Sequence, residues 1–196
     1  MPIVPPSFTA AIDAFDRRAD TAFDHLRGKP AADRLFYTAT ELGDFSLVWL
    51  IFGALRGLRS EHDWHAAVRL GLAMGAESVL VNAGIKTIFR RRRPPPHLSH
   101  PLRVRRPRTS SFPSGHSTAA FSAAVLLSED DDLWPVYFTV AAIVASSRVY
   151  VKMHHASDVV AGATLGVGLG LLGRRVSPLP PVPRALPGAP RGSRGA

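Results

Sequence analysis

Three polar patches interrupt the apolar stretches of this 196-residue chain, and their side chains are suited to holding an anion. The first runs from Lys86 to Pro94, the second from Pro113 to His116, and the third from Ser147 to Asp158. Ammonium and guanidinium groups, together with the N–H groups at a helix start, bind tetrahedral oxyanions well. Each patch lies at the end of an apolar stretch, so helices packed up and down would bring all three to one face. The chemistry that these patches indicate is the handling of a phosphate group.

In the first patch, Lys86 and Arg93 are seven residues apart, which is about two helical turns, so both can point the same way. A compact ammonium charge and a planar guanidinium fork complement different oxygens of one phosphate. Four consecutive arginines, Arg90 to Arg93, have a second interpretation. They could be a solvated helix end or an anchor for lipid headgroups.

The second patch combines a helix start with a histidine. Ser114 is a favourable residue at a helix start, and Gly115 would let backbone N–H groups approach an anion. The helix dipole adds to the attraction. His116 would then lie beside the anion, where it could donate a proton. The alternative is an ordinary helix cap followed by a surface histidine.

The third patch places a carboxylate four residues after a histidine. On a helix His154 and Asp158 would share a face, and a carboxylate on one ring nitrogen makes the other more basic. Such an imidazole is a nucleophile, and Arg148 could hold another phosphate oxygen. His155 would point roughly 100° away, so we interpret it as a surface or interface residue. A lone His/Asp pair could also be only a hydrogen bond at a helix end.

The apolar stretches predict an all-α fold. They cover 45–58, 66–89, 117–127, 133–147 and 159–173, and the third and fifth reach the length of a span when extended to 115–128 and 155–173. Residues 8–26 have the pattern of an amphipathic interfacial helix, and a second short helix is expected at 31–42. We therefore expect an integral-membrane bundle of about five embedded helices. A soluble bundle is the alternative, because no window of spanning length is free of charge.

Composition sets the domain boundaries and excludes some chemistry. The chain has no cysteine, which excludes disulfides and a thiol nucleophile. We expect an interfacial segment at 1–42, a membrane catalytic domain at 43–175, and a disordered tail rich in Pro, Gly and Arg at 176–196. Gly162 and Gly166 form a GxxxG pair, which permits close helix packing.

Taken together, the patches resemble the type 2 phosphatidic acid phosphatase superfamily of lipid phosphatases. Its signature is Lys-x6-Arg-Pro, then Pro-Ser-Gly-His, then Ser-Arg-x5-His-x3-Asp, and this chain matches it in order and spacing over about residues 40–173. The resemblance implies that His154 forms a phosphohistidine, that Asp158 orients it and that His116 is the general acid. It implies a phosphate cage that contains Lys86, Arg93, Arg148 and the N–H groups of Ser114 and Gly115. It also implies that no metal or other cofactor is needed.

The expected substrate is a phosphorylated lipid in the bilayer. Phosphatidic acid, phosphatidylglycerol-phosphate, polyprenyl phosphate or pyrophosphate, and polyprenyl-phosphoryl sugar phosphates all remain open. The family also includes soluble haloperoxidases, which a short membrane-like chain disfavours. One rival is a catalytically silent membrane protein that binds a phospholipid headgroup. A nucleic-acid binder is disfavoured, because the arginines flank apolar stretches without interleaved aromatic residues. The sequence does not indicate an oligomeric state.

The expected location is a bacterial plasma membrane. The loop 90–113 should lie over the site, and eight of its residues are arginine: Arg90, Arg91, Arg92, Arg93, Arg103, Arg105, Arg106 and Arg108. The positive-inside rule therefore favours a site that faces the cytoplasm, with the N-terminal segment on the same side. The acidic turn 129–132 and Arg174 should lie at the opposite end of the bundle.

Overall fold

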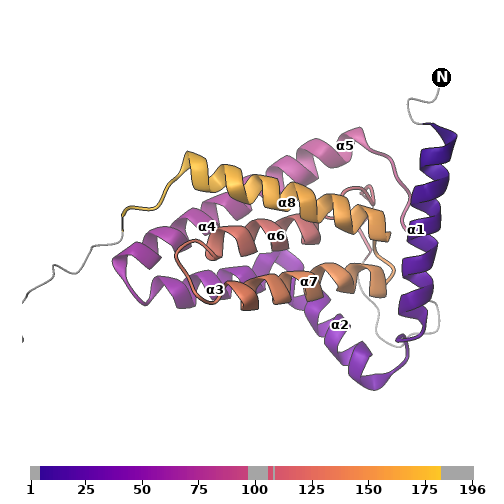
Figure 1. Cartoon of the computed structure of the whole chain (residues 1–196), viewed down its shortest axis with the longest axis horizontal. Helices are drawn as coiled ribbons and strands as arrows, with labels where there is room; N and C mark the ends of the chain where they lie inside the picture. The colour runs from indigo at the N-terminus through magenta and orange to yellow at the C-terminus, as the bar shows by residue number, and fades with distance from the viewer. Residues whose placement is uncertain (1–4, 97–105, 108, 182–196) are drawn as a thin grey trace, which may run out of the picture.

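Long helices lie side by side in the computed structural model of this chain, which describes residues 5–96, 106–107 and 109–181 (Figure 1). The helices are α1 (Pro6–Asp24), α2 (Pro30–Leu42), α3 (Leu47–Gly57), α4 (Glu61–Val79), α5 (Lys86–Ile88), α6 (Gly115–Leu127), α7 (Trp134–Tyr150) and α8 (Ala156–Val176). A 3-10 turn, Asp44–Ser46, precedes α3, and a π-helical turn, Leu80–Ile85, joins α4 to α5. Each predicted helix is present, with ends within a few residues of those expected, and the all-α prediction is confirmed. Parts of the predicted loop 90–113 and most of the predicted tail lie outside the described residues.

Local sequence signals explain where these helices begin. The hydroxyl of Ser114 accepts the N–H of Ser117 at 3.4 Å at the start of α6, and the hydroxyl of Ser60 accepts the N–H of Asp63 at 3.1 Å at the start of α4. Proline occupies the first turn of α1, α2 and α7, where its missing N–H costs no hydrogen bond. The start of α6 lies at the end of the bundle where the three patches meet, whereas α4 and α7 begin at the opposite end.

Helix α6 lies at the centre of the bundle, packed against α4, α7 and α8. Its alanines, Ala120, Ala123 and Ala124, are fully buried. A β-carbon added to Gly162 of α8 would lie 2.5 Å from the carbonyl oxygen of Ser114, and one added to Gly166 would meet the carbonyl of Thr118. The GxxxG pair therefore brings the backbones of α6 and α8 into direct contact.

Two helical stretches are long and apolar enough to cross a bilayer: Glu61–Ile88, and α8. A third span is formed if α2 and α3, which meet at an angle of 71°, are taken as one bent span. The expected number of about five spans is therefore only partly met. Helix α6 has 13 residues, or about 20 Å at 1.5 Å per residue, which is shorter than a hydrocarbon core. Since the other helices surround it, it does not have to span the bilayer by itself.

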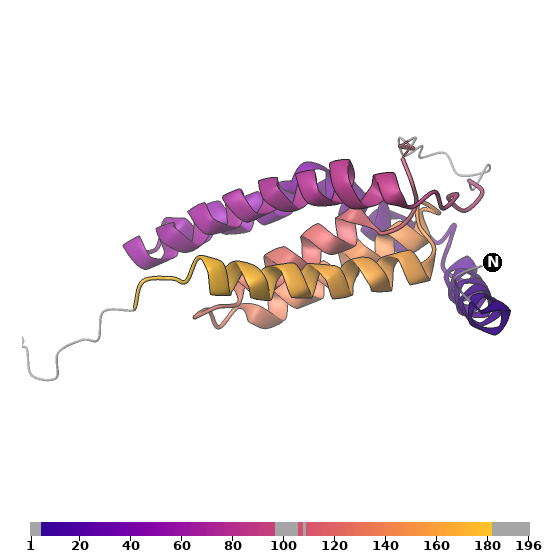
Figure 2. The same ribbon diagram turned by 90° about the horizontal axis from the view of Figure 1, so that it is seen from above.

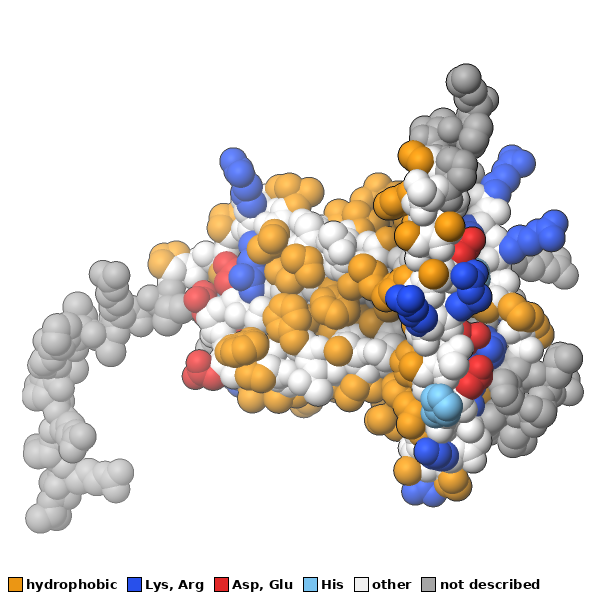
Figure 3. All heavy atoms as spheres, turned by 45° about the vertical axis from the view of Figure 1, so that its right-hand side comes forward, with side chains coloured by type: hydrophobic (Ala, Val, Ile, Leu, Met, Phe, Trp, Pro, Cys, Tyr) orange, Lys and Arg blue, Asp and Glu red, His pale blue; other side chains and the backbone are white. Residues whose placement is uncertain are grey.

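The flank of the bundle is apolar, as a lipid-facing surface should be (Figure 3). Leu50 and Leu55 of α3, Leu72 of α4, and Leu171 and Leu172 of α8 are all exposed. Figure 2 shows the same bundle from above, with α4 on one side and α8 on the other. Apolar exposure of this kind agrees with a membrane protein.

A cluster of ion pairs lies at the end of the bundle where α6 turns into α7. Arg69 pairs with Glu129 at 2.6 Å, and Arg59 pairs with Asp131 at 2.5 Å. Arg174 joins them, with its Nε 3.4 Å from Glu129. As predicted, the acidic turn and Arg174 lie together, at the end away from the three signature patches.

Helix α1 stands across the other end of the bundle (Figures 1 and 2). Its Asp16 is 7% exposed, although the sequence pattern placed this residue on the polar face. Asp16 accepts the backbone N–H and the hydroxyl of Ser157, both at 2.8 Å, and a guanidinium N–H of Arg91 at 2.7 Å. Lys152 pairs with Asp20 at 2.8 Å. Buried and half-buried polar contacts therefore hold helix α1 against the start of α8 and the turn before it.

Candidate active site

A cavity of about 400 Å³ opens where α5, the start of α6 and the end of α7 meet. Six of the predicted site residues line it: Lys86, Arg93, Gly115, His116, Arg148 and His154. Helices α4 and α7 end here, whereas α6 and α8 begin here, so the alternation of chain direction brings the patches together. The two other predicted residues, Ser114 and Asp158, are fully buried and do not line the cavity.

His154 is held in the turn between α7 and α8. Its Nδ1 lies 2.6 Å from the carbonyl oxygen of Ser111, so Nδ1–H donates there and Nε2 keeps its lone pair. The backbone N–H of His154 donates to the carbonyl of Arg148 at 3.0 Å. Burial and the guanidinium groups of Arg148 and Arg93 hold the pKa of His154 well below its ordinary value. The ring is therefore neutral, as a nucleophile must be.

Asp158 does not orient His154 in the way that the sequence suggested. Helix α8 begins at Ala156, so the two residues do not share a helix face, and 3.9 Å separates Asp158 Oδ2 from His154 Nδ1. The carboxylate instead accepts the hydroxyl of Ser111 at 2.5 Å and an N–H of Arg91 at 2.6 Å. Asp158 thus contacts Ser111, and the carbonyl of Ser111 in turn contacts the His154 ring.

His155 is also more than a surface residue. Its backbone N–H donates to Asp158 Oδ2 at 2.9 Å, and its Nδ1 lies 3.2 Å from the same oxygen. The two residues cap the first turn of α8 reciprocally. The half-buried His155 therefore helps to hold Asp158 in place.

His116 has a carboxylate partner that the sequence did not reveal. Its Nε2 lies 2.8 Å from Oδ1 of Asp44, which comes from the 3-10 turn before α3. The carboxylate stabilises the protonated ring and fixes its orientation, but burial and the guanidinium group of Arg148 outweigh it and lower the pKa of His116 below its ordinary value. A β-carbon added to the neighbouring Gly43 would lie 2.9 Å from the His116 ring, so a glycine is needed for this close approach.

The cations reach the cavity from separate elements. Lys86 Nζ donates to Asn82 Oδ1 at 2.8 Å, and a β-carbon on Gly115 would lie 3.1 Å from that ammonium group. Arg93 donates to the carbonyl of Met153 at 2.9 Å, and its Nη1 lies 3.2 Å from His154 Nε2. A glycine at 115 leaves room for the ammonium group and an anion together.

Arg148 is almost fully buried, and its Nη1 donates to the hydroxyl of Thr40 in α2. Its Nε has no hydrogen-bond partner among the described residues. A buried, incompletely paired guanidinium is costly unless an anion completes its hydrogen bonds. An anion in the cavity would supply that partner.

The N–H groups that are free to form the predicted anion nest are not quite the ones expected. The N–H of Ser114 donates to the carbonyl oxygen of Asp158 at 3.1 Å, so it is already used. The hydroxyl of Ser114 is the cap of α6 and also accepts the hydroxyl of Ser117 at 2.8 Å. The N–H groups of Gly115 and His116, in the first turn of α6, have no acceptor within the described part of the chain. The nest is therefore one residue further along than predicted.

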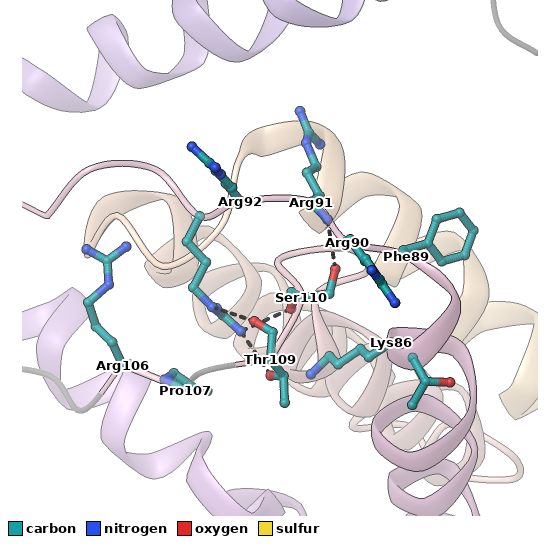
Figure 4. Close-up of a pocket in the computed structure, with 11 residues that line it drawn as sticks. Lys86, Phe89, Arg90, Arg91, Arg92, Arg106, Pro107, Thr109 and Ser110 are labelled. Carbon is teal, nitrogen blue, oxygen red and sulfur yellow. Dashed lines mark hydrogen bonds between the residues drawn. The ribbon is translucent and has the colours of Figure 1, made fainter. Parts of the chain in front are cut away.

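A second, open pocket of about 540 Å³ continues outward from the cavity. Figure 4 shows Lys86, Thr109 and Ser110 at its inner side, whereas Arg92 extends outward. Arg90 and Arg92 are exposed and make no hydrogen bond or ion pair with any described residue. Of the two interpretations of the arginine run, the headgroup anchor fits Arg90 and Arg92, whereas Arg91 and Arg93 belong to the site.

Comparison with known proteins identifies the family of this chain. Residues 66–179 match the family model of the PAP2 superfamily. A decaprenylphosphoryl-5-phosphoribose phosphatase from Mycobacterium tuberculosis is 32% identical over 136 residues, which are 68% of this chain and 73% of that protein.

Two solved structures have the same fold. The crystal structure of the first transmembrane PAP2-type phosphatidylglycerolphosphate phosphatase from Bacillus subtilis superposes with a TM-score of 0.64 at 24% identity, covering 89% of this chain and 88% of that one. The structure of Aquifex aeolicus LpxE gives a TM-score of 0.62 at 28% identity, covering 82% and 92%. The chain therefore belongs to the PAP2 superfamily and is a membrane lipid phosphatase of that type.

Proposed function

We propose that this phosphatase removes the terminal phosphate of a polyprenyl-phosphoryl sugar phosphate through a phosphohistidine at His154. The observation that carries the mechanism is the hydrogen bond from His154 Nδ1 to the carbonyl of Ser111. It directs the Nε2 lone pair toward a cavity that contains Lys86, Arg93 and Arg148. Phosphoryl transfer depends mainly on positioning and charge stabilisation, and this cavity supplies both.

In the first step, Nε2 of His154 attacks phosphorus. A P–N bond forms as the P–O bond to the lipid-linked alcohol breaks. His116, held by Asp44, donates its proton to the departing oxygen. Lys86, Arg93 and Arg148, with the N–H groups of Gly115 and His116, stabilise the charge on the three equatorial oxygens.

In the second step, water attacks the same phosphorus. His116, now neutral, takes a proton from the water as the P–N bond breaks. Inorganic phosphate leaves, and His154 and His116 return to their starting forms. No step requires a metal ion.

The similarity to the mycobacterial phosphatases supports the choice of substrate. Arg90 and Arg92, which line the outer pocket and have no partner among the described residues, also suit a lipid with further negative charge. These features favour a lipid whose phosphorylated sugar is linked through a second phosphate.

The test is phosphate release by detergent-solubilised protein in EDTA. The panel is phosphatidic acid, phosphatidylglycerol-phosphate, polyprenyl mono- and pyrophosphate, and polyprenyl-phosphoryl 5-phosphoribose. We expect the last to have the highest kcat/KM, and His154→Ala to release no phosphate from any of them. A higher kcat/KM for another lipid would overturn the proposed substrate assignment. Release by the His154→Ala protein would overturn the nucleophile.

A further inference from the structure

A carboxyl group that the proposed mechanism does not use lines the catalytic cavity. Glu77, on α4, is 6% exposed, and its Oε1 is buried without a hydrogen-bond partner among the described residues. A buried carboxyl group without a partner destabilises the fold. This loss of stability is offset if a ligand in the cavity donates a hydrogen bond to the carboxyl group.

Glu77 attracts the charge of Lys86 across the cavity but does not contact it directly. The ammonium group donates to Asn82 at 2.8 Å, and no ion pair joins Lys86 to Glu77 in the part of the chain that the structure describes. Ion pairs at the far end of the same helix, such as Arg69 with Glu129 at 2.6 Å, show how this bundle neutralises its charges elsewhere. The carboxyl group of Glu77 therefore remains available to a ligand.

Neutral hydrogen-bonding groups line the wall of the cavity between Glu77 and Lys86. Asn82 Oδ1 accepts from the ammonium group of Lys86 at 2.8 Å, and Asn82 Nδ2 donates to the hydroxyl of Ser78 at 3.3 Å. Asn82 lies in the π-helical turn Leu80–Ile85, and such turns are frequent at functional sites. Ser46, at the start of α3, faces the same cavity. Hydroxyl, amide and carboxyl groups of this kind recognise sugars and polyols rather than hydrocarbon.

The cavity is also larger than a phosphate group requires. Its volume of about 400 Å³ falls in the range of roughly 300–1,000 Å³ that is typical of pockets for small organic molecules. The cations lie at the site end, whereas Glu77 lies nine residues, or about 13 Å of helix, before Lys86. A bound phosphate would leave the space toward Glu77 to the group that carries it.

We propose that Glu77 accepts a hydrogen bond from a hydroxyl of the leaving group, so that the enzyme selects phosphate esters of sugars or polyols over esters without a nearby hydroxyl. This inference rests on the proposed function and adds the determinant of its selectivity. A site built to accept a substrate hydroxyl rejects an analogue that lacks it, because its own polar group is then left unpaired.

The test compares polyprenyl-phosphoryl 5-phosphoribose with its 2-deoxy and 3-deoxy ribose analogues. For the wild-type protein, removing the hydroxyl that Glu77 contacts should lower kcat/KM about 10- to 100-fold, because a buried polar group is then left without its hydrogen-bond partner. In Glu77→Gln the same removal should cost only a few-fold, because a neutral amide discriminates less. The quantity measured is the coupling between Glu77→Gln and the removal of the substrate hydroxyl, obtained from the four kcat/KM values.

Glu61→Gln is the matched control, since it makes the same change on the exposed first turn of the same helix. It should keep the wild-type preference, and thermal unfolding in detergent verifies that both variants are folded. An equal loss for all three substrates in Glu77→Gln would overturn the inference, because Glu77 would then support the cage or the fold. A wild-type protein that turns over all three equally would also overturn it while leaving the phosphatase intact. If the wild-type protein hydrolyses none of the three lipids, the proposed substrate is wrong.

Discussion

At the scale of single residues, the backbone orients His154, the proposed nucleophile. Nδ1 of His154 meets the carbonyl of Ser111, and the carboxylate of Asp158 meets the hydroxyl of Ser111. The carbonyl fixes the same tautomer that a carboxylate would fix. We therefore propose that Asp158 positions His154 indirectly, through Ser111.

This arrangement predicts a moderate effect of Asp158→Asn. In a direct carboxylate–histidine pair, the amide imposes the wrong tautomer and lowers kcat about 10⁴-fold. Here the tautomer is held by Ser111, so we expect kcat to fall by about 100-fold, similar to the loss of an outer partner of a ligating histidine. Steady-state kinetics with the preferred lipid measures the effect. A loss near 10⁴-fold would mean that the carboxylate contacts His154 directly during turnover.

The pH dependence of kcat/KM should report the neutral state of His154. Burial and the cations of Arg148 and Arg93 lower its pKa, so the ring loses its proton below the usual range and activity persists at lower pH. Arg93→Gln removes one cation, which raises the pKa of His154 and moves the acid limb of the profile to higher pH.

Arg92→Gln serves as the control for that experiment, because Arg92 is the neighbour of Arg93 and its guanidinium group extends away from the cavity. It should move the acid limb less than Arg93→Gln does. An acid limb that stays in place in Arg93→Gln, or shifts to lower pH, would show that another group controls this part of the profile.

The signature residues could be predicted from sequence because their spacing is local, as with Lys86 and Arg93. Their partners could not. Asp16, Asp44 and Thr40 reach the site from the first forty-four residues, and no spacing rule connects them to His116 or His154. Asp16 looked like one more charge on an amphipathic helix, and only the packing of α1 on α8 buries it.

At the scale of elements, the glycines of α8 decide how closely it packs on α6. Gly166 faces the carbonyl of Thr118, whereas a β-carbon on Gly168, two residues later, would meet nothing within 4 Å. Gly166→Ala should therefore lower the free energy of unfolding by about 1–3 kcal/mol, as overpacking does. Since α6 and α8 both begin at the site, activity should fall as well.

Gly168→Ala provides the matched control, since it makes the same change on the same helix without a clash. Thermal unfolding in detergent should give a lower Tm for Gly166→Ala and an equal or higher Tm for Gly168→Ala, because alanine favours the helix. Equal Tm values for the two variants would contradict the assigned packing of α6 on α8.

The positions of the helices could be read from the apolar stretches, but the number of spans could not. A sequence window does not reveal that α6, with 13 residues, is enclosed by α4, α7 and α8. A sequence window also does not reveal that α8 begins only at Ala156, so that His154 lies in the preceding turn and not on the helix. Both facts depend on how neighbouring helices pack.

At the scale of the whole molecule, charge is distributed unevenly between the two ends. Arg59 and Arg69 at the far end pair with the acidic turn, whereas Arg90 and Arg92 at the site end have no partner within the described ranges. Under the positive-inside rule this favours a site at the cytoplasmic face. Helix α1, with its charged residues, would then lie at that interface.

Because the chain has no cysteine, single cysteines can test its orientation. Arg92→Cys marks the site end, and Asp132→Cys marks the exposed far turn. In intact cells an impermeant thiol reagent should label Asp132→Cys and should label Arg92→Cys only after permeabilisation. The opposite pattern would place the site on the outer face.

The central claim is that His154 carries the phosphoryl group during turnover. The most direct test is to mix the protein with lipid labelled with ³²P at the terminal phosphate, quench in alkali within one turnover, and measure protein-bound label. We predict acid-labile label on the wild-type protein at His154 and none on His154→Ala. Equal labelling of the two proteins, or label mapped to another residue, would contradict the account.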